Sequence, residues 1–384
     1  MSALKCERLE TVFYELLGIK GVGYHEKLVA DYLKSHFQAR GIAVEEDNAG
    51  EEVNGDSGNL IVRLPGKGKG VNLPGICILT HMDTVKFDGE VRFRTDDKRV
   101  VWADNSPILG GDDRAGIAIV LELCDVLREN SSEHPPVVLV FTIAEECGLI
   151  GANHLDIPAL ACNAGFVLDC SQDPGTIIVQ APYSVGLILT LKGQAAHAGI
   201  HPERGISAIM VLVEALSHLR MGRIDEETTA NWGVIKGGKA TNIVMPELSL
   251  TGEIRSLCKE KLQKQLAHIR EELDKAVVKY TLSSETKPEY VLDVSEHYYS
   301  FCLTEKDLPV QLAMRAARKL GMEPILRSWG GGSDANVLNH SGLPTVNLAI
   351  GMDDVHGPRE HISLYDLEKV VDILHELALQ AVEG

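Results

Sequence analysis

The residues best suited to chemistry are two adjacent carboxylates, Asp112 and Asp113, within the sequence GGDDRAG at 110–116. The preceding glycines allow the backbone to turn sharply and to approach another group closely. Because a carboxylate has two oxygens, it can bridge two metal ions about 3.5–4 Å apart, as two-metal catalysis requires. The same pattern is also typical of a capped helix N-terminus, where aspartate complements the helix dipole. Taken alone, the motif favours the cap.

Other acidic and histidine residues lie at the ends of apolar stretches that the sequence predicts to be strands. They are His81, the pair Glu145 and Glu146, Asp169, and His356, and the first three of these sites directly follow such a stretch. Polar residues beyond the carboxyl ends of parallel strands line the usual ligand crevice, so we expect these side chains to meet. Each has an ordinary alternative as a hydrogen-bonded histidine, a solvated acidic pair, a turn cap or a loop residue. Together with Asp112 these are five sites, and it is improbable that the ordinary alternative holds at all five of them at one edge of a sheet.

Imidazole nitrogens and carboxylate oxygens together suit zinc, with manganese or cobalt as alternatives. We therefore expect two divalent metal ions, each with its own ligands and one ligand in common. Asp112 is assigned as the bridge between them. His81 and Asp169 are expected to hold one ion, and Glu146 and His356 the other.

Two further acids near this cluster have predicted supporting roles. Asp83 lies two residues after His81 and is expected to hydrogen-bond the imidazole and fix its tautomer. Glu145 is then free to act as the general base on the attacking water, because adjacent residues at a bending strand end can point in different directions.

A second group of candidates lies between residues 182 and 332. His197, between a predicted strand and a predicted helix, can polarise a substrate carbonyl or stabilise an oxyanion. Arg255 can grip a carboxylate and Asn242 is a second substrate-side candidate, although an exposed strand arginine is the ordinary interpretation. Gly331 can present a backbone N–H to substrate, or the triple glycine 330–332 can be a flexible turn. Two further histidines, His201 and His361, are assigned no role.

The elements expected to position these residues follow two patterns. Predicted helices at 6–17, 26–39, 115–127, 307–320 and 364–382 alternate with predicted strands at 59–64, 75–80, 137–143, 164–168 and 345–350. This alternation predicts an α/β catalytic domain at 1–181 and 297–384, with a mostly parallel mixed sheet flanked by helices. Between them, residues 182–296 show the β-α-β-β-α-β order of a ferredoxin-like α+β unit, which we interpret as an inserted lid domain.

The composition limits the partners and the compartment. The chain has 37 Lys and Arg against 55 Asp and Glu, giving a formal net charge of −18. This acidity argues against nucleic acid or an anionic membrane as a partner. Residues 1–20 show no signal-peptide pattern, and the longest apolar runs are too short to cross a bilayer. The 8 cysteines form no CxxC pair, so reduced thiols and a cytoplasmic location are predicted.

Seven motifs together resemble the co-catalytic, dinuclear zinc exopeptidase family. They are HMDTV at 81–85, GGDDRAG at 110–116, AEECG at 144–148, LDC at 168–170, AAHAG at 195–199, GGSDAN at 331–336 and HGPREHI at 356–362. The family includes peptidase T, glutamate carboxypeptidase, succinyl-diaminopimelate desuccinylase and aminoacylase, and the chain is most similar to the peptidase T-like members. The resemblance implies the phosphorylase/hydrolase-like fold of zinc exopeptidases and places the family's ligands, base and substrate residues on the positions named above. It also implies a cis peptide bond between Asp112 and Asp113. Arg114 departs from the family, in which lysine is common at this position, and so does the pair His201-Pro202.

The resemblance implies hydrolysis of short peptides, as by a tripeptide aminopeptidase. A carboxypeptidase or an N-acyl amino acid deacylase of the same family is the alternative, because metal ligation does not separate these activities. A peptide- or metal-binding protein without catalysis is a third reading, which the intact base and complete ligand set oppose. Lids of this family often pair with one another, so a homodimer through residues 182–296 is also implied.

Overall fold

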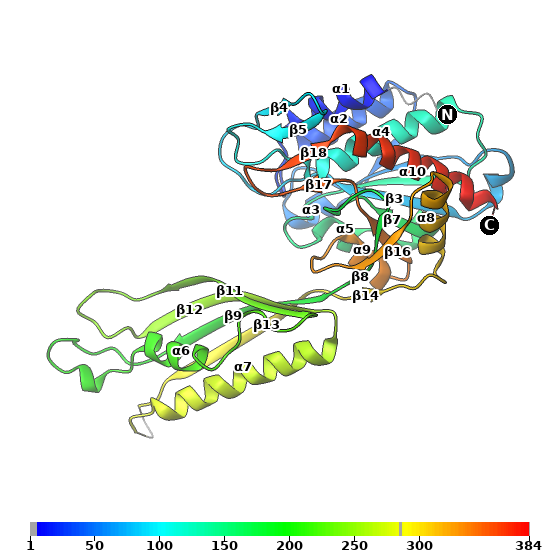
Figure 1. The fold of residues 1–384 in the computed structure, drawn as a ribbon. Helices are drawn as coiled ribbons and strands as arrows, with labels where there is room; N and C mark the ends of the chain where they lie inside the picture. The colour runs from blue at the N-terminus through cyan, green and yellow to red at the C-terminus, as the bar shows by residue number, and fades with distance from the viewer. Residues whose placement is uncertain (1–5, 284–285, 384) are drawn as a thin grey trace. The chain divides into compact units, whose positions relative to one another are not determined.

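The computed structural model describes residues 6–283 and 286–383, which form two compact units. The first unit contains Met1–Gln180, Phe301–Trp329 and Ser333–Gly384, and the second contains Ala181–Ser300 with Gly330–Gly332. Figure 1 follows the chain through both units. Among the described residues, no helix combines the length and the apolar character needed to span a membrane.

The first unit is built on a nine-stranded sheet with the order β1-β2-β6-β3-β7-β16-β8-β14, and β15 also pairs with β8. Its strands are β1 (Val44–Glu46), β2 (Leu60–Leu64), β3 (Gly75–His81), β6 (Val137–Thr142), β7 (Cys162–Val167), β8 (Thr176–Ala181), β14 (Phe301–Cys302), β15 (Ile325–Ser328) and β16 (Thr345–Leu348). The central strands β6, β3, β7 and β16 are parallel, whereas β2 and β8 join them antiparallel. Every residue of β3 and β6 is buried, as expected of parallel strands covered on both faces. The predicted mostly parallel mixed sheet is confirmed.

Helices pack on this sheet through apolar side chains. They are α1 (Cys6–Leu17), α2 (Lys27–Gln38), α3 (Ala49–Val53), α4 (Gly111–Glu129), α5 (Ile150–His154), α8 (Leu308–Lys319), α9 (Asp334–His340) and α10 (Leu364–Glu383). Helix α4 contacts β3, α1 and α10, while α9 contacts β7, β16 and α5. Figure 1 shows α1, α4 and α10 along one side of the sheet and α5 and α9 along the other. Apolar side chains of α1, α2, α4, α8 and α10 form one continuous core with the face of the sheet against which they pack.

A small four-stranded sheet lies beside this core. It has the order β17-β18-β5-β4, from Met352–Asp353, His361–Ser363, Val100–Ala103 and Phe93–Thr95. Strands β4 and β5 form an antiparallel hairpin that precedes the GGDDRAG turn. Because β18 pairs with β5, the loop that joins β17 to β18 and carries His356 is anchored to the hairpin that leads into the Asp112 turn.

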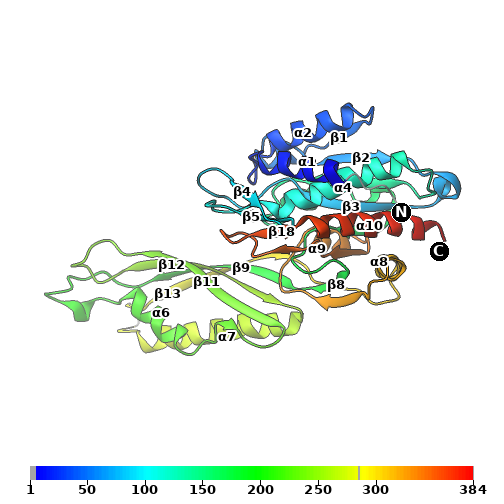
Figure 2. The same ribbon diagram turned by 45° about the horizontal axis from the view of Figure 1, so that its top comes forward.

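The second unit is a five-stranded antiparallel sheet covered by two helices. Its elements are β9 (Tyr183–Lys192), α6 (Ala208–Leu216), β10 (Gly222–Arg223), β11 (Thr228–Gly237), β12 (Glu247–Ser256), α7 (Lys259–Lys279) and β13 (Glu289–Tyr298). The strand order β11-β12-β9-β13 is the predicted ferredoxin-like arrangement, and β10 adds an edge strand that was not predicted. Figure 2 shows α6 and α7 on the same face of this sheet, where both contribute to a second apolar core.

The structure differs from the sequence prediction mainly in short elements. Helix α9 was not predicted, because seven residues after a triple glycine give no periodic apolar pattern. Helix α4 starts at Gly111, four residues before the predicted start, but Asp112 and Asp113 have non-helical backbone angles. The two aspartates therefore occupy an irregular turn that leads into the helix.

Candidate active site

The two carboxylate oxygens of Asp112 face two different imidazoles. Oδ1 lies 3.0 Å from Nε2 of His81, which is the last residue of β3. Oδ2 lies 3.1 Å from Nε2 of His356, in the loop between β17 and β18. One side chain therefore connects the end of the central strand with a loop more than 240 residues later in the chain. This is the geometry that a bridging carboxylate requires.

The structure brings together all five predicted metal ligands. Three sets of side chains each offer ligand atoms within 4.8 Å of one another: His81, Asp112 and Asp169; Asp112, Glu146 and His356; and His81, Glu145 and Glu146. Asp112 belongs to the first two sets, which together contain the five predicted ligands. The third set leaves open which of the two glutamates would hold an ion, so the individual ligand roles stay predictions.

The hydrogen bonding of His81 fits a cation beside its ring. Nδ1 lies 3.0 Å from the main-chain oxygen of Asp83, and a carbonyl can only accept, so Nδ1 carries the proton. Nε2 then faces Asp112 either with a second proton, as in the hydrogen bond between them, or, in the neutral ring, with a lone pair that a cation can use. Two facing acceptors favour a positive charge between them, and a histidine whose other nitrogen is fixed by a carbonyl is typical of metal ligands. The chemistry of the donor set therefore fits divalent metal.

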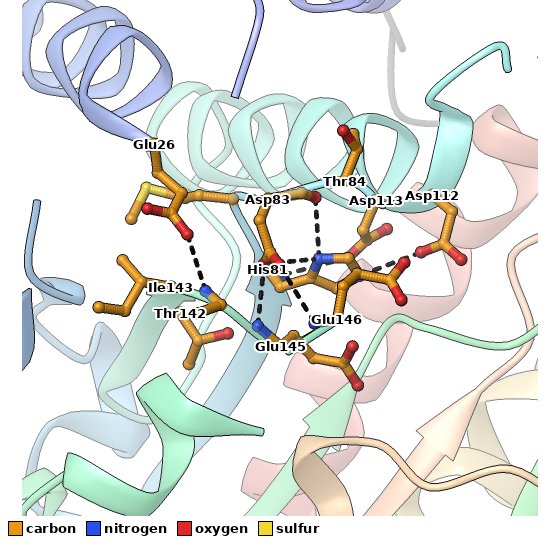
Figure 3. A network of polar contacts seen from close by, with 12 residues as sticks. Glu26, His81, Asp83, Thr84, Asp112, Asp113, Thr142, Ile143, Glu145 and Glu146 are labelled. Atoms are coloured by element: carbon orange, nitrogen blue, oxygen red, sulfur yellow. Dashed lines mark hydrogen bonds and ion pairs between the residues drawn. The ribbon is translucent and has the colours of Figure 1, made fainter. Parts of the chain in front are cut away.

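The Asp83 side chain holds the strand end that carries the two glutamates. Its Oδ1 accepts a hydrogen bond from the Glu145 N–H at 3.0 Å, and its Oδ2 accepts one from the Glu146 N–H at 3.1 Å. Oδ1 also lies 3.3 Å from Nδ1 of His81. Figure 3 shows Asp83 between His81 and this segment. Asp83 thus contacts the imidazole and also fixes the backbone of Glu145 and Glu146.

The neighbouring glutamates differ in their surroundings. Glu146 Oε1 lies 2.7 Å from Nε2 of His356. The Glu145 side chain is 8% exposed, and burial followed by the charge of Asp169 raises its pKa well above the usual value. The two adjacent side chains therefore meet different partners, which is what separate roles as ligand and base would need.

The turn that presents Asp112 is held by a buried glutamate, Glu360. Its carboxylate accepts hydrogen bonds from the N–H groups of Leu109 at 2.8 Å, Gly110 at 3.0 Å and Asp112 at 3.2 Å. The peptide bond between Asp112 and Asp113 is cis, which confirms the expectation from the resemblance. Burial opposes the ionisation of Asp112, but hydrogen bonds from His356 and His81 outweigh it and hold its pKa below the usual value.

The Asp113 side chain does not face the two imidazoles and instead stabilises the turn through hydrogen bonds to β3 and to α4. Its carboxylate accepts hydrogen bonds from the Thr80 hydroxyl, from the Gly116 N–H at 2.9 Å and from the His81 N–H at 3.3 Å. Burial is the largest cause that raises its pKa to about 8. The second aspartate of the motif therefore has a structural role, as the helix-cap reading allowed, while the first faces the imidazoles.

Replacing Gly116 by alanine is expected to disturb this turn. A Cβ at position 116 would overlap the Asp113 carboxylate, which has no room to move because its oxygens are already bonded. Overpacking of this kind costs about 1–3 kcal/mol of stability, and we expect a loss in that range in urea unfolding together with reduced metal retention. Gly18→Ala is the matched control, since its Cβ would meet only ordinary contacts. Equal stability of the two variants would contradict this account.

Asp169 is held by Asn347, which sequence reasoning missed. The Asn347 Oδ1 accepts a hydrogen bond from the Asp169 N–H at 3.0 Å, and its Nδ2 donates one to the Asp169 carbonyl at 2.6 Å. Glu360 was also missed as a supporting residue, although it stands four residues after His356 in a quoted motif. Asn347 lies inside an apolar strand. A single amide side chain in such a strand was the sequence feature that could have indicated a supporting role.

Arg114, the departure from the family, is fully buried in the first unit. Its guanidinium donates hydrogen bonds to the main-chain oxygens of Met82 at 2.6 Å, Gly21 at 3.2 Å and Ile19 at 3.4 Å. Arg114 therefore connects the loop after β3 with the loop after α1 through hydrogen bonds. It places no side chain among the candidate ligands.

The candidate substrate residues of the second unit fall into two groups. His197 bridges to Ile243, and the Ala198 N–H donates to the Asn242 carbonyl at 3.0 Å, so His197 and Asn242 are neighbours. They lie near the end of the sheet at which Lys192 pairs with Glu247.

Arg255 and Gly331 belong to the opposite end of the same sheet. Arg255 pairs with Ser184, which also pairs with Tyr298, and the Tyr298 ring packs where a Cβ of Gly332 would lie. Strand β12 separates this end from the other by about 26 Å. Arg255 is also bonded to Glu253 at 3.0 Å, and its side chain is half-buried, not exposed as the ordinary interpretation would have it. The four predicted residues therefore do not meet within one copy of the unit.

The chain is similar to known peptidases over nearly its whole length. The description "Peptidase dimerisation domain" matches residues 182–281, and "Peptidase family M28" matches residues 59–198. The chain is 37% identical to the uncharacterised protein YqjE of Bacillus subtilis, with 97% of this chain and 99% of that protein covered. Aminopeptidase PepT of Bacillus cereus has a solved structure that superposes with a TM-score of 0.87 at 34% identity, with 99% of this chain and 100% of that chain covered.

The chain belongs to the M20 peptidase family that includes peptidase T. A tripeptidase from Staphylococcus aureus superposes with a TM-score of 0.91 at 31% identity over 99% of this chain and 100% of that one. As an M20 peptidase, the chain is a metal-dependent hydrolase, and the resemblance seen in the sequence motifs is confirmed. The inserted unit is the M20 dimerisation domain.

Proposed function

We propose that this M20 peptidase is a tripeptide aminopeptidase that uses two divalent metal ions, in the first place zinc. The observation that carries the proposal is Asp112, whose two oxygens face His81 and His356 at 3.0 and 3.1 Å with the Glu145 side chain nearby. It is supported by the similarity to a PepT aminopeptidase and a tripeptidase. Manganese or cobalt suits the same oxygen and nitrogen donors.

The proposed ligand roles follow the side-chain groups. His81 and Asp169 would hold one ion, Glu146 and His356 the other, and Asp112 both. When bound, the ions would polarise the peptide carbonyl and lower the pKa of the attacking water. Glu145 would take a proton from that water and deliver it to the leaving amine. Asp83 would keep the His81 ring and the Glu145 backbone in place.

The remaining proposals concern substrate contacts and assembly. We propose that His197 and Asn242 support the oxyanion, and that Arg255 and Gly331 contact the peptide. Because these pairs lie at opposite ends of β12, a short peptide cannot contact all four from one copy. A homodimer through the inserted domain, which the matched dimerisation domain supports, would allow a second copy to supply one pair. We propose a cytoplasmic location on the basis of the reduced cysteines.

The order of residue release tests this function. The protein is treated with a chelator, reloaded separately with zinc, manganese or cobalt, and given a tripeptide with three different residues. We expect at least a hundredfold loss of rate on chelation, recovery with at least one metal, and release of the N-terminal residue first. Dipeptides and N-acyl amino acids serve as comparison substrates. First release of the C-terminal residue, or faster cleavage of N-acyl amino acids, would replace the aminopeptidase by a carboxypeptidase or a deacylase.

A further inference from the structure

The segment that carries Glu145 and Glu146 is held by side chains from three other parts of the chain. Four successive N–H groups, from Ile143 to Glu146, each donate to a side-chain oxygen. The acceptors are Asn59 Oδ1 at 3.0 Å, Glu26 Oε1 at 2.9 Å, and Asp83 Oδ1 at 3.0 Å and Oδ2 at 3.1 Å. Figure 3 shows the carboxylates of Glu26 and Asp83 directed at this segment. Each backbone N–H from residue 143 to residue 146, which includes the proposed base Glu145, is therefore held by one side-chain acceptor.

Of the two carboxylates in this group, Asp83 contacts His81, whereas Glu26 contacts none of the proposed ligands. Its side chain is 0% exposed, and its Oε1 accepts hydrogen bonds from both Tyr24 N–H and Ala144 N–H at 2.9 Å. It is the N-cap residue of α2, but its side chain makes no capping hydrogen bond to that helix. The carboxylate is directed instead at a strand end 118 residues later.

Ala144 needs this support because of its backbone conformation. Its φ is +47°, in the left-handed region that residues with a side chain rarely adopt. Such conformations persist only where surrounding contacts hold them. The conformation of Ala144 sets the direction in which the next residue, Glu145, leaves the end of β6. The acceptor on Ala144 therefore contributes to the placement of Glu145, together with the direct hydrogen bond from the Glu145 N–H to Asp83.

We propose that Glu26 is a positioning residue for the general base: its Oε1 holds the Ala144 amide and thereby aims the Glu145 carboxylate. The inference rests on the proposed role of Glu145. What matters in this account is an acceptor atom at the right place, not the charge of Glu26. Glutamine at position 26 retains that atom, whereas methionine has a similar volume and lacks it.

The test compares Glu26→Gln and Glu26→Met in the metal-loaded full-length protein. We expect Glu26→Met to lower kcat about 100-fold, since a misplacement of about 1 Å at a reacting group has an effect of this size. KM and bound metal should stay within about twofold, and Glu26→Gln should retain kcat within about fivefold. Hydrogen exchange of the amides of residues 143–147 should be at least tenfold faster in Glu26→Met and unchanged in Glu26→Gln. A role in stability alone would not produce this split.

Glu122→Met is the matched control. Glu122 is another buried glutamate that accepts two hydrogen bonds, in this case from Arg8 at 2.6 and 2.7 Å, and it does not belong to the site. Its variant should keep kcat and the exchange rates of residues 143–147. If Glu26→Met is not recovered folded, Glu26→Asp takes its place, because the shorter side chain withdraws the acceptor but keeps the charge.

Two results would overturn the inference. One is a Glu26→Met variant with at least half of the wild-type kcat, and the other is a Glu26→Gln variant as slow as Glu26→Met. A Glu145→Gln variant measured in parallel separates the two proposals. If Glu145→Gln is slow and Glu26→Met is fast, only the role of Glu26 fails. If Glu145→Gln is itself fast, the proposed mechanism fails first.

Discussion

Replacing Glu145 by glutamine is expected to lower kcat for a tripeptide by about 10³-fold while both metal ions remain bound. Glutamine fills the same volume but cannot take up the proton of the attacking water. The Glu145 side chain is almost fully buried beside the candidate ligands, so no solvent group can readily replace it. Steady-state kinetics together with metal content per chain would measure the effect.

The neighbouring residue provides the control. Glu146→Gln changes the same functional group one residue later, at a side chain that lies 2.7 Å from His356. We expect this variant to lose bound metal as well as rate. Both glutamates lie near His81, so the comparison also decides which of them is the metal ligand. A Glu145→Gln variant that loses metal and a Glu146→Gln variant that keeps it would exchange the two proposed roles.

The second large effect is expected for Asp112→Asn. The amide keeps one oxygen and replaces the other by an NH2 group, so one of the two imidazoles would face a donor instead of a carboxylate oxygen. We expect the loss of at least one of the two ions. Partners of ligands typically contribute about 10–100-fold to affinity or activity, and a bridging ligand should exceed that range. Equilibrium dialysis with zinc and tripeptide hydrolysis would measure both changes.

Asp125→Asn is the matched control for this variant. Asp125 is a buried aspartate on the same helix, where it accepts hydrogen bonds from Arg40 at 2.6 and 2.7 Å. Its replacement is expected to reduce stability through the lost ion pair and to leave metal content and kcat unchanged. Two ions per chain in Asp112→Asn would show that Asp112 does not bridge.

The parts of the fold that follow local patterns could be predicted from the sequence. The apolar stretches that became β3 and β6 are buried on both faces, and their length and position matched the expected strands. The order of elements in the inserted domain was sufficient to predict its topology. The proximity of the candidate ligands that follow these strands could also be predicted, because parallel strands end at the same edge of a sheet.

The supporting contacts could not be predicted in this way. Glu360 reaches Leu109 across 251 residues, Asn347 reaches Asp169 across 178, and Glu26 reaches Ala144 across 118. Such hydrogen bonds join single side chains to single backbone groups, so they leave no periodic signal in the sequence. The separation of Arg255 from His197 could not be predicted either. It depends on the length of β12, which the residues around His197 and Arg255 do not indicate.

Anomalous diffraction from crystals grown with zinc would locate the proposed ions. We expect two peaks about 3.5–4 Å apart with the Asp112 carboxylate between them. One peak should lie beside His81 and Asp169, and the other beside Glu146 and His356. A single peak, or an Asp112 side chain turned away from both His81 and His356, would contradict the proposed two-metal centre.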